Sequence, residues 1–246
     1  MAVASSNSHR QDNQPVYVLH TYPFKETSLV VELFAHGFGR VATTAKGARR
    51  PKSAMRGMLQ SFQPLIATWS GKLELKTLHS LDWAGGLLLL KGEALMCGFY
   101  LNELLLRLLP REDPHEALFE YYSLTLKTLS GSQDLATTLR RFELKLLQEL
   151  GYAIPLNVDE NDAAIIDTQT YIYQAEQGAI LVNSRFNGKK NGVQLHGKTL
   201  IDMAKDDYSN PQTQQQSKQL MRYLLTYYLG DKPLHTRQLL IDLQEL

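Results

Sequence analysis

The stretch SLVVELFAHGFGRVATTAK, residues 28–46, holds two strand-like runs separated by a turn. β-Branched residues recur in both runs, and the HGFG segment between them contains two glycines. β-Branched and aromatic residues favour strands, whereas glycine favours turns. Three further runs of this kind lie at 16–22, 64–70 and 73–81. Five short strands in so small a segment predict a small barrel or sandwich. Their size and number suit an OB-fold, a five-stranded barrel whose face and loops bind oligonucleotides.

Beyond Trp83 the apolar residues recur at the spacing of amphipathic helices. This spacing predicts helices over 93–109, 114–131, 134–151, 213–230 and 235–246, with a small hairpin and a polar loop before the fourth. The predicted fold class is therefore α+β and multidomain, a five-stranded OB-fold barrel followed by an α-helical bundle. The predicted parts are a flexible tail (1–14), the OB-fold nucleic-acid-binding domain (15–82) and the helical domain (83–246) with its hairpin and loop insertion (152–194).

Composition excludes several classes of protein. The 246 residues are 43% hydrophobic and 21% charged, which is typical of a folded, soluble chain. Cys97 is the only cysteine, so neither an internal disulfide nor a cysteine zinc cluster can form. We interpret Cys97 as a packed core thiol, with a nucleophile as the alternative. No secretory signal or run of about 20 apolar residues is present, which predicts a cytoplasmic protein without a membrane segment.

Charge is distributed unevenly along the chain. The formal net charge is only +1, yet residues 1–82 hold ten Lys and Arg against five Asp and Glu. Residues 39–57 contain no acidic residue and six cations: Arg40, Lys46, Arg49, Arg50, Lys52 and Arg56. Cations that neutralise phosphates release counterions, which is a main source of affinity for nucleic acids. We therefore expect this strand and loop to bind a polyanion.

Aromatic residues accompany these cations in the predicted barrel. If they face outward they can stack on bases, as in single-strand-binding proteins. If they face inward they fill the barrel core, and the sequence leaves both interpretations open. The residues are Tyr17, Tyr22, Phe24, Phe34, Phe38, Phe62 and Trp69.

The helix predicted over 134–151 carries Arg140 and Arg141 beside Phe142, close to its apolar stripe. Two guanidinium groups at an apolar groove suit a partner segment with a carboxylate and an apolar side chain. The alternative is an ordinary intramolecular salt bridge, with Glu143 or Glu103 as the acid.

Residues 192–199, GVQLHGKT, match the phosphate-loop pattern G-x-x-x-x-G-K-[ST], so a nucleotide-binding protein using Gly197, Lys198 and Thr199 is one alternative. The motif requires a buried strand that leads directly into the loop, but polar residues precede it here. We favour a simple loop followed by a helix. The seven histidines lack metal-ligand spacing, and no catalytic motif is evident. The sequence thus predicts no enzymatic activity, no cofactor and no metal.

Four segments together resemble the RecO family of bacterial DNA-repair proteins, along nearly the whole chain from Val16. They are VLHTYPFKETSLVVELFAHGFGRVATTAKGARRPKS, LQSFQPL, GFYLNELLLRLL and LRRFELKLLQELGY. The resemblance implies an OB-fold, a helical domain and a non-catalytic recombination mediator at the bacterial nucleoid. Such a protein binds single- and double-stranded DNA and anneals complementary strands. With RecR, and in many bacteria RecF, it loads RecA onto DNA covered by the single-stranded-DNA-binding protein (SSB).

Position by position, the resemblance assigns roles to the two arginine-containing segments. It implies DNA contacts for the basic segment, and it implies that Arg140, Arg141 and Phe142 receive the acidic, apolar-ended tail of SSB. Many family members also bind zinc through four cysteines after the Gly-Tyr at 151–152. This sequence has none there, so we expect no zinc. An RNA-binding OB module without repair partners remains the other alternative.

Overall fold

The computed structural model describes residues 9–86, 89–152, 154–182, 192–230 and 233–236. These form two compact units. Unit 1 contains the residues up to Ser132 together with the described residues from Leu234 onward. Unit 2 runs from Gln133 to Pro233. The predicted polar loop before residue 192 and most of the last predicted helix lie outside the described residues.

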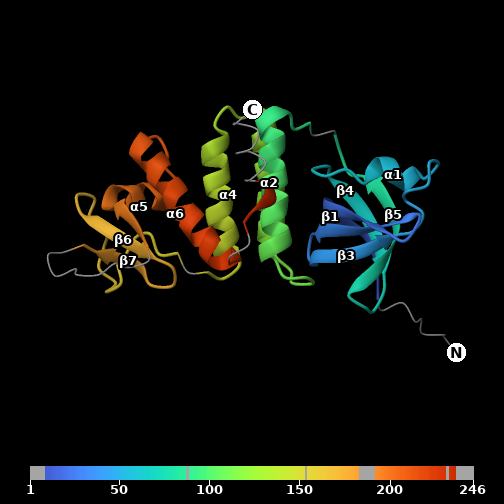
Figure 1. The fold of residues 1–246 in the computed structure, drawn as a ribbon, viewed down its shortest axis with the longest axis horizontal. Coiled ribbons are helices and arrows are strands. Elements are labelled where there is room, and N and C mark those ends of the chain that lie inside the picture. Colours follow the sequence, from blue (N-terminus) through green and yellow to red (C-terminus); the bar gives the residue numbers. More distant parts are fainter. Residues whose placement is uncertain (1–8, 87–88, 153, 183–191, 231–232, 237–246) are drawn as a thin grey trace. The chain divides into compact units, whose positions relative to one another are not determined.

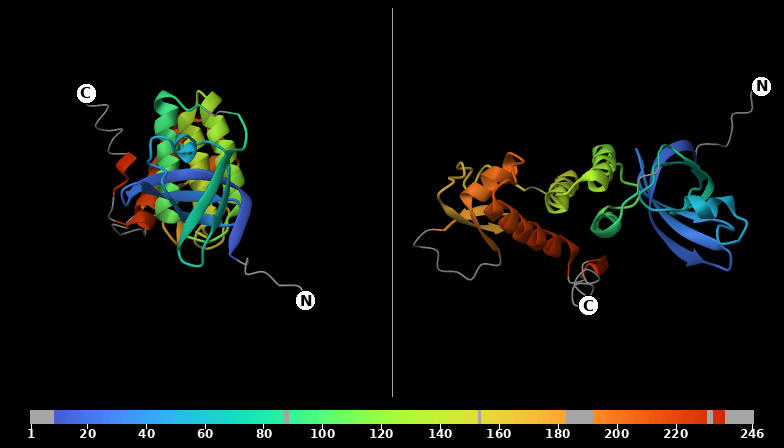
Figure 2. Two further views of the ribbon diagram at one scale, coloured as in Figure 1. Left: turned by 90° about the vertical axis from the view of Figure 1, so that its right-hand side faces the viewer. Right: turned by 90° about the horizontal axis from the view of Figure 1, so that it is seen from above.

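Unit 1 begins with a closed five-stranded barrel in the order β1-β2-β3-β5-β4, in which β1 also pairs with β4 (Figures 1 and 2). Strands β3 and β5 are parallel, and the other neighbours are antiparallel. This arrangement confirms the predicted OB-like barrel. The strands are β1 (Arg10–Phe24), β2 (Ser28–Ala35), β3 (Gly39–Ala45), β4 (Leu65–Ser70) and β5 (Leu75–Trp83).

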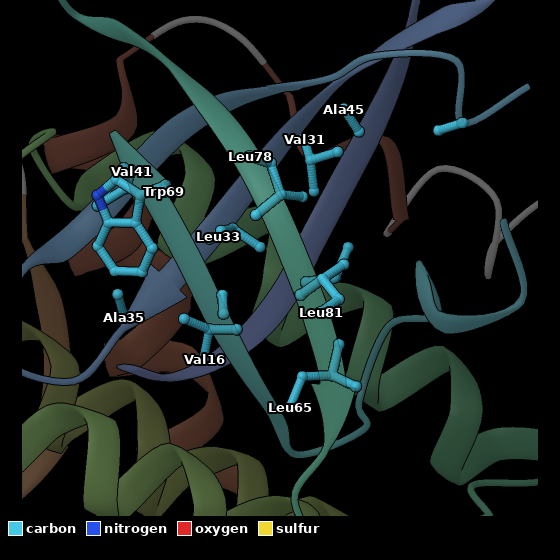
Figure 3. Close-up of a cluster of buried hydrophobic side chains, with 13 residues drawn as sticks. Val16, Val31, Leu33, Ala35, Val41, Ala45, Leu65, Trp69, Leu78 and Leu81 are labelled. Atoms are coloured by element: carbon cyan, nitrogen blue, oxygen red, sulfur yellow. The ribbon is translucent and has the colours of Figure 1, made fainter. Parts of the chain in front are cut away.

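The barrel core follows from the alternation of side chains along the strands. Val31, Leu33 and Ala35 of β2 point inward together, and Val41 and Ala45 of the neighbouring strand β3 point into the same core beside them (Figure 3). Trp69 of β4 lies at one end of this cluster and is 2% exposed. Apolar burial of this kind contributes about 25 cal/mol per Å2 removed from water, which makes the core the main source of barrel stability.

Two long helices follow the barrel in the described part of unit 1, α2 (Gly92–Leu108) and α3 (Glu116–Gly131). Aromatic rings of α3 cover part of the outer face of the barrel. The Phe119 ring lies 5.4 Å from that of Tyr17 on β1 and 5.3 Å from that of Phe34 on β2. These outward-facing barrel residues are therefore buried as deeply as the inward-facing ones. Cys97 of α2 is buried as well, which agrees with the interpretation as a core thiol.

Unit 2 consists of three helices and a three-stranded sheet in the order β7-β6-β8. Helix α6 contacts α4, α5 and β8, so it forms the centre of the unit. The elements are α4 (Leu135–Glu149), β6 (Thr170–Gln174), β7 (Gly178–Leu181), β8 (Val193–His196), α5 (Gly197–Ala204) and α6 (Pro211–Leu229).

The structure differs from the expectation at two places. Strand β1 starts at Arg10, so residues 10–14 pair with β4 instead of belonging to a flexible tail. The sequence does not reveal this part of the strand, because residues 10–14 are all polar and lack the apolar–polar alternation of a half-buried strand. Strand β8 adds a third strand to the predicted hairpin. The sequence does not reveal it, since only Leu195 of its four residues is buried. Among the described helices, none has the length and hydropathy that a membrane-spanning segment needs.

Candidate nucleic-acid interface

The cations of the predicted DNA-binding segment lie on one anchored loop. This basic loop, residues 46–56, leaves the barrel at the end of β3 and leads into the short helix α1 (Ala54–Met58). Ala48 in its middle is fully buried in the barrel core, and Met55 and Met58 pack against the same core. The loop is thus attached at its centre and at its far end. All five cationic side chains of the loop are exposed. They are Lys46, Arg49, Arg50, Lys52 and Arg56.

A tight turn sets the direction of the loop. Gly47 has a φ of +70°, a left-handed conformation that glycine adopts with little strain. The amide of Arg50 donates to the carbonyl of Gly47 over 3.0 Å, and that of Ser53 donates to the carbonyl of Arg50 over 3.1 Å. Successive turns therefore present the cations along a short ordered path.

Arg49 joins the basic loop to the loop between β1 and β2. Its backbone amide donates to the carbonyl of Thr27 at 2.9 Å, and its guanidinium Nη1 donates to the carbonyl of Glu26 at 3.2 Å. Lys25, exposed in the same β1–β2 loop, therefore lies beside the basic loop. The sequence analysis missed Lys25 because it is more than twenty residues away along the chain. Antiparallel pairing of β2 and β3 puts the loop before β2 and the loop after β3 at the same end of the barrel. A prediction of this pairing could therefore have brought Lys25 into the predicted site.

The charge of this loop is uncompensated. Within the described part of the chain, none of its five exposed cations forms an ion pair with a carboxylate, and neither does Lys25. Some other basic residues of unit 1 are neutralised, as Lys76 is by Glu112 over 2.6 Å. Since carbonyl oxygens carry no net charge, Arg49 keeps its full charge despite its hydrogen bonds. The loop is therefore a concentrated positive surface on the barrel.

Arg40 does not share this surface. Its Nη1 lies 3.3 Å from Oε2 of the buried Glu32, and its Nε donates to the carbonyl of Leu109 at 2.9 Å. Arg111 pairs with the same carboxylate and with Glu74. Burial lowers the pKa of Arg111, but the hydrogen bonds with these carboxylates outweigh it and hold the pKa above its ordinary value. The sequence groups Arg40 with the five cations of the loop, but the structure separates it from them, because the connection between α2 and α3 covers this end of β3.

Most of the aromatic residues fill the protein interior. Trp69 is buried in the barrel core, so the core interpretation holds for it. Tyr17 and Phe34 face outward and are buried under α3, and Phe62 is buried against Phe99 of α2. Phe24 and Phe38 are partly buried, and only Tyr22, at 45%, belongs to the exposed class among the seven. The usual OB-fold binding face on strands 2 and 3 is covered near Phe34 by α3. This part of the face is therefore not available to a ligand.

In unit 2, the three residues predicted to bind a partner tail occupy different environments. Phe142 is fully buried and belongs to the core. Arg140 donates to Oε1 of the buried Glu143 at 2.6 Å, which is the salt bridge foreseen as the alternative. Arg141 is more open, at 40% side-chain exposure, and pairs with the exposed Asp206 over 2.7 Å.

A buried tyrosine lies beside Arg141. The Arg141 guanidinium lies 5.7 Å from the ring centre of Tyr208. Burial raises the pKa of Tyr208 to about 12, and no described group hydrogen-bonds its hydroxyl. A partner that displaces Asp206 from Arg141 would therefore find a guanidinium and an unused hydroxyl close together.

The phosphate-loop match does not form a phosphate loop. Residues 193–196, which would have to curl around phosphates, are extended in β8 and pair with β6. Gly197 then starts α5, where an added Cβ would lie 1.9 Å from the carbonyl oxygen of Ile166. Lys198 pairs with Asp202 at 2.8 Å, and the Thr199 hydroxyl bonds Gln216 at 2.6 Å. The lysine and the threonine thus both bind other side chains of unit 2.

The predicted insertion is held together by apolar and tyrosine contacts. Tyr171 and Tyr173 of β6 are buried, and their hydroxyls bond the amide of Ile166 and the carbonyl of Pro155. Among the described residues, no group of three or more His, Cys, Asp or Glu side chains is arranged to hold a metal ion.

The closed order of the strands, with β3 parallel to β5, and the helical region that follows define the class of this protein. It is an OB-like barrel protein with an added α-helical part. Residues 10–87 match the family model described as "Recombination protein O N terminal", and residues 89–238 match "Recombination protein O C terminal". The chain therefore belongs to the RecO family.

Relatives of nearly the same length support this assignment. A DNA repair protein RecO of Nitrosospira multiformis is 54% identical over 98% of this chain and 99% of its own length. The DNA repair protein RecO of Aromatoleum aromaticum is 52% identical over 98% of this chain and all of its own length. The DNA repair protein RecO of Dechloromonas aromatica is 51% identical over 96% of this chain and 97% of its own length.

Proposed function

We propose that this chain is a recombination mediator in DNA repair, without catalytic activity of its own. It binds single- and double-stranded DNA, anneals complementary strands and, together with RecR, helps to load RecA onto SSB-coated single strands. The observation that carries the proposal is the basic loop, whose exposed cations have no acidic partner among the described residues. Membership of the RecO family supplies the repair context.

DNA binding follows from the chemistry of this surface. Lys and Arg side chains contact phosphates, which carry no sequence information, so binding is expected to be largely independent of sequence. Low specificity suits a protein that must act on any damaged stretch of DNA. The basic loop and Lys25 together are the proposed DNA contacts, while Arg40 is omitted because Glu32 neutralises it.

The second part of the proposal concerns SSB. The acidic tail of SSB binds unit 2 at Arg141, with Arg140 and Tyr208 close by. An exposed ion pair such as that of Arg141 with Asp206 contributes at most about 1 kcal/mol, so a tail carboxylate can displace Asp206. Phe142 supports the site from the core and does not contact the tail. RecR, and RecF where it takes part, act with the protein after it has docked on SSB.

Annealing of complementary strands that are both covered with SSB tests the proposal directly. The full chain is expected to accelerate annealing, and RecR is expected to convert its complexes into ones that accept RecA. An RNA-binding module would instead prefer RNA and leave SSB-coated DNA unannealed. Acceleration on bare DNA with none on SSB-coated DNA would retain the DNA contacts but contradict the mediator role.

A further inference from the structure

Unit 1 contains a pocket of about 240 Å3 at the end of the barrel opposite the basic loop. The basic loop follows the last residue of β3, whereas the pocket lies near the first residues of that strand. Its lining comes from the start of β1, the β2–β3 turn, the β4–β5 loop and the α2–α3 connection. The residues that matter here are Gln11, Phe38, Trp69, Lys76 and Glu112.

The aromatic wall of the pocket has an unused hydrogen-bond donor. Trp69 is 2% exposed, and its ring meets that of Phe38 edge-on at 5.4 Å between centres. No described group accepts a hydrogen bond from Nε1 of Trp69. Buried indole N–H groups usually have an acceptor. The partly buried Phe38 therefore supplies the ring surface of the pocket, whereas the core residue Trp69 supplies only the edge with its N–H donor, which a ligand can satisfy.

The polar wall of the pocket is electrically neutral. Lys76 Nζ lies 2.6 Å from Oε1 of Glu112, so the ammonium is already compensated and attracts a phosphate only weakly. An ion pair still presents both donors and acceptors to a neutral ligand. Gln11 adds an amide, which likewise has a donor and an acceptor end. This chemistry suits the edge of a neutral heteroaromatic ring better than an anion.

The size of the pocket limits the ligand further. Sites for drug-sized molecules usually measure about 300–1,000 Å3, so this pocket holds a smaller group. A flat ring with donor and acceptor atoms that fits here is a nucleobase. We infer that the pocket binds one unstacked base of a single DNA strand whose phosphates are held by the basic loop. This inference rests on the proposed DNA binding and adds a base contact to it.

Two features of the barrel agree with such a path for the strand. An OB-fold contacts roughly 4–16 nucleotides, so one strand can reach from the basic loop to the pocket. Leu73 lies in the β4–β5 loop between the pocket residues Gly71 and Lys76, and it is 78% exposed. Apolar side chains of this kind are used by DNA-binding proteins to contact or separate bases. Leu73 is thus placed to contact the base next to the bound one.

The test compares two strands of equal length with the full-length protein, one normal and one abasic at every position. The normal strand is expected to bind roughly 5- to 150-fold more tightly, the range for stacking one base on an aromatic side chain. Both strands are expected to show the same salt dependence, since their phosphates are identical. Gln11→Trp fills the pocket and is expected to abolish most of the difference. Gln14→Trp, on the same strand but outside the pocket, is the matched control and is expected to keep it.

Trp69→Phe keeps a ring in the core but removes the indole donor, and its expected loss of affinity for the normal strand is about 2- to 12-fold. Circular dichroism and thermal unfolding establish that each variant is folded. Equal affinity of the wild type for both strands, with a normal salt dependence, would overturn the base pocket and leave the proposed DNA binding intact. A base preference that survives Gln11→Trp would also overturn it. Absence of salt-dependent binding to either strand would refute the proposed function itself.

Discussion

Arg40 and Glu32 form an ion pair on neighbouring strands of the barrel, with Arg40 Nη1 3.3 Å from Glu32 Oε2. The Glu32 side chain is only 3% exposed, and Arg111 binds its other oxygen. A buried carboxylate is costly unless cations compensate it. The most strongly fixed arginine of the predicted DNA segment is therefore a structural residue, and the proposed DNA contacts begin after it, at Lys46.

Arg40→Ala should lower stability without changing how DNA is held. Removing one of two cations beside a buried carboxylate is expected to cost about 1–3 kcal/mol of unfolding free energy. Urea unfolding measures this loss. The slope of DNA affinity against salt is expected to stay at the wild-type value. A lower slope with unchanged stability would show that Arg40 contacts phosphate after all.

Arg49→Ala combined with Arg50→Ala should change the salt dependence of single-strand binding. Six phosphate contacts, from the basic loop and Lys25, give an expected slope of log affinity against log salt of about −4, since each contact contributes about −0.7. The double variant is expected to reduce the slope in magnitude by about 1.4. Titrations of a labelled oligonucleotide at several salt concentrations measure it.

Lys127→Ala is the matched control for that experiment. Lys127 is an exposed cation of unit 1 on α3, away from the basic loop. Its removal changes the net charge without removing a proposed contact, so the slope should be unaltered. An equal effect of the two substitutions would mean that the whole surface attracts DNA without a defined site.

Much of the fold could be predicted because it depends on local patterns. Strand β2 was expected at 28–35 and is found there, and the boundaries of α2, α3 and α4 differ from the predicted ones by one or two residues. These elements have strong apolar periodicity and clear breakers such as Gly131 and Gly151. Strand β8 has neither, because a short strand with one buried residue carries almost no periodic signal.

What could not be predicted is which element covers which surface. The alternation along β3 gives two faces, but only the packed structure shows that the α2–α3 connection covers Arg40 and that α3 covers Phe34. The same limit applies to Lys25, which joins the basic loop through strand pairing. The sequence shows where the cations lie along the chain. Which of them pair with a carboxylate, as Arg40 does with Glu32, depends on the tertiary structure.

Arg141→Ala should weaken binding of an SSB C-terminal peptide more than a comparable substitution elsewhere on α4. Loss of the ion pair of this exposed arginine is expected to cost about 0.5–1 kcal/mol, or roughly 2- to 5-fold in affinity. Lys145→Ala is the control, because Lys145 is on the same helix and pairs with Glu149. Fluorescence anisotropy of a labelled peptide measures both. Equal affinities for the two variants would remove Arg141 from the site.

Neither the wild type nor the Lys198→Ala variant is expected to bind a nucleotide. The wild type is expected not to bind Mg·ATP, because β8 occupies the positions that a phosphate loop requires. Lys198 instead pairs with Asp202, whose other contact is the hydroxyl of Thr213 at 2.7 Å. Calorimetric titration with Mg·ATP tests this for both proteins. Binding by the wild type that disappears in the variant would restore the nucleotide-binding alternative.

Glu103 of α2 holds the described residues 235–236 to unit 1. Its carboxylate accepts hydrogen bonds from the amides of His235 and Thr236 at 2.8 and 2.9 Å, and from the Thr236 hydroxyl at 2.7 Å. Burial raises the pKa of Glu103, but these hydrogen bonds lower it more, so the pKa lies below its ordinary value. A depressed carboxyl pKa stabilises the folded state above the ordinary pKa of about 4.3.

This stabilisation should be lost as the pH falls through the depressed pKa of Glu103, because the protonated carboxyl accepts the amide hydrogen bonds poorly. Glu103→Gln is expected to melt at a lower temperature than the wild type at pH 7. The difference between the two should begin to shrink below the ordinary carboxyl pKa of about 4.3 and vanish below the depressed pKa of Glu103, where both proteins carry a neutral side chain. Thermal unfolding of both proteins across this pH range measures it. A difference that stays constant into acid would show that Glu103 acts through packing, and that its charge does not hold the chain end in place.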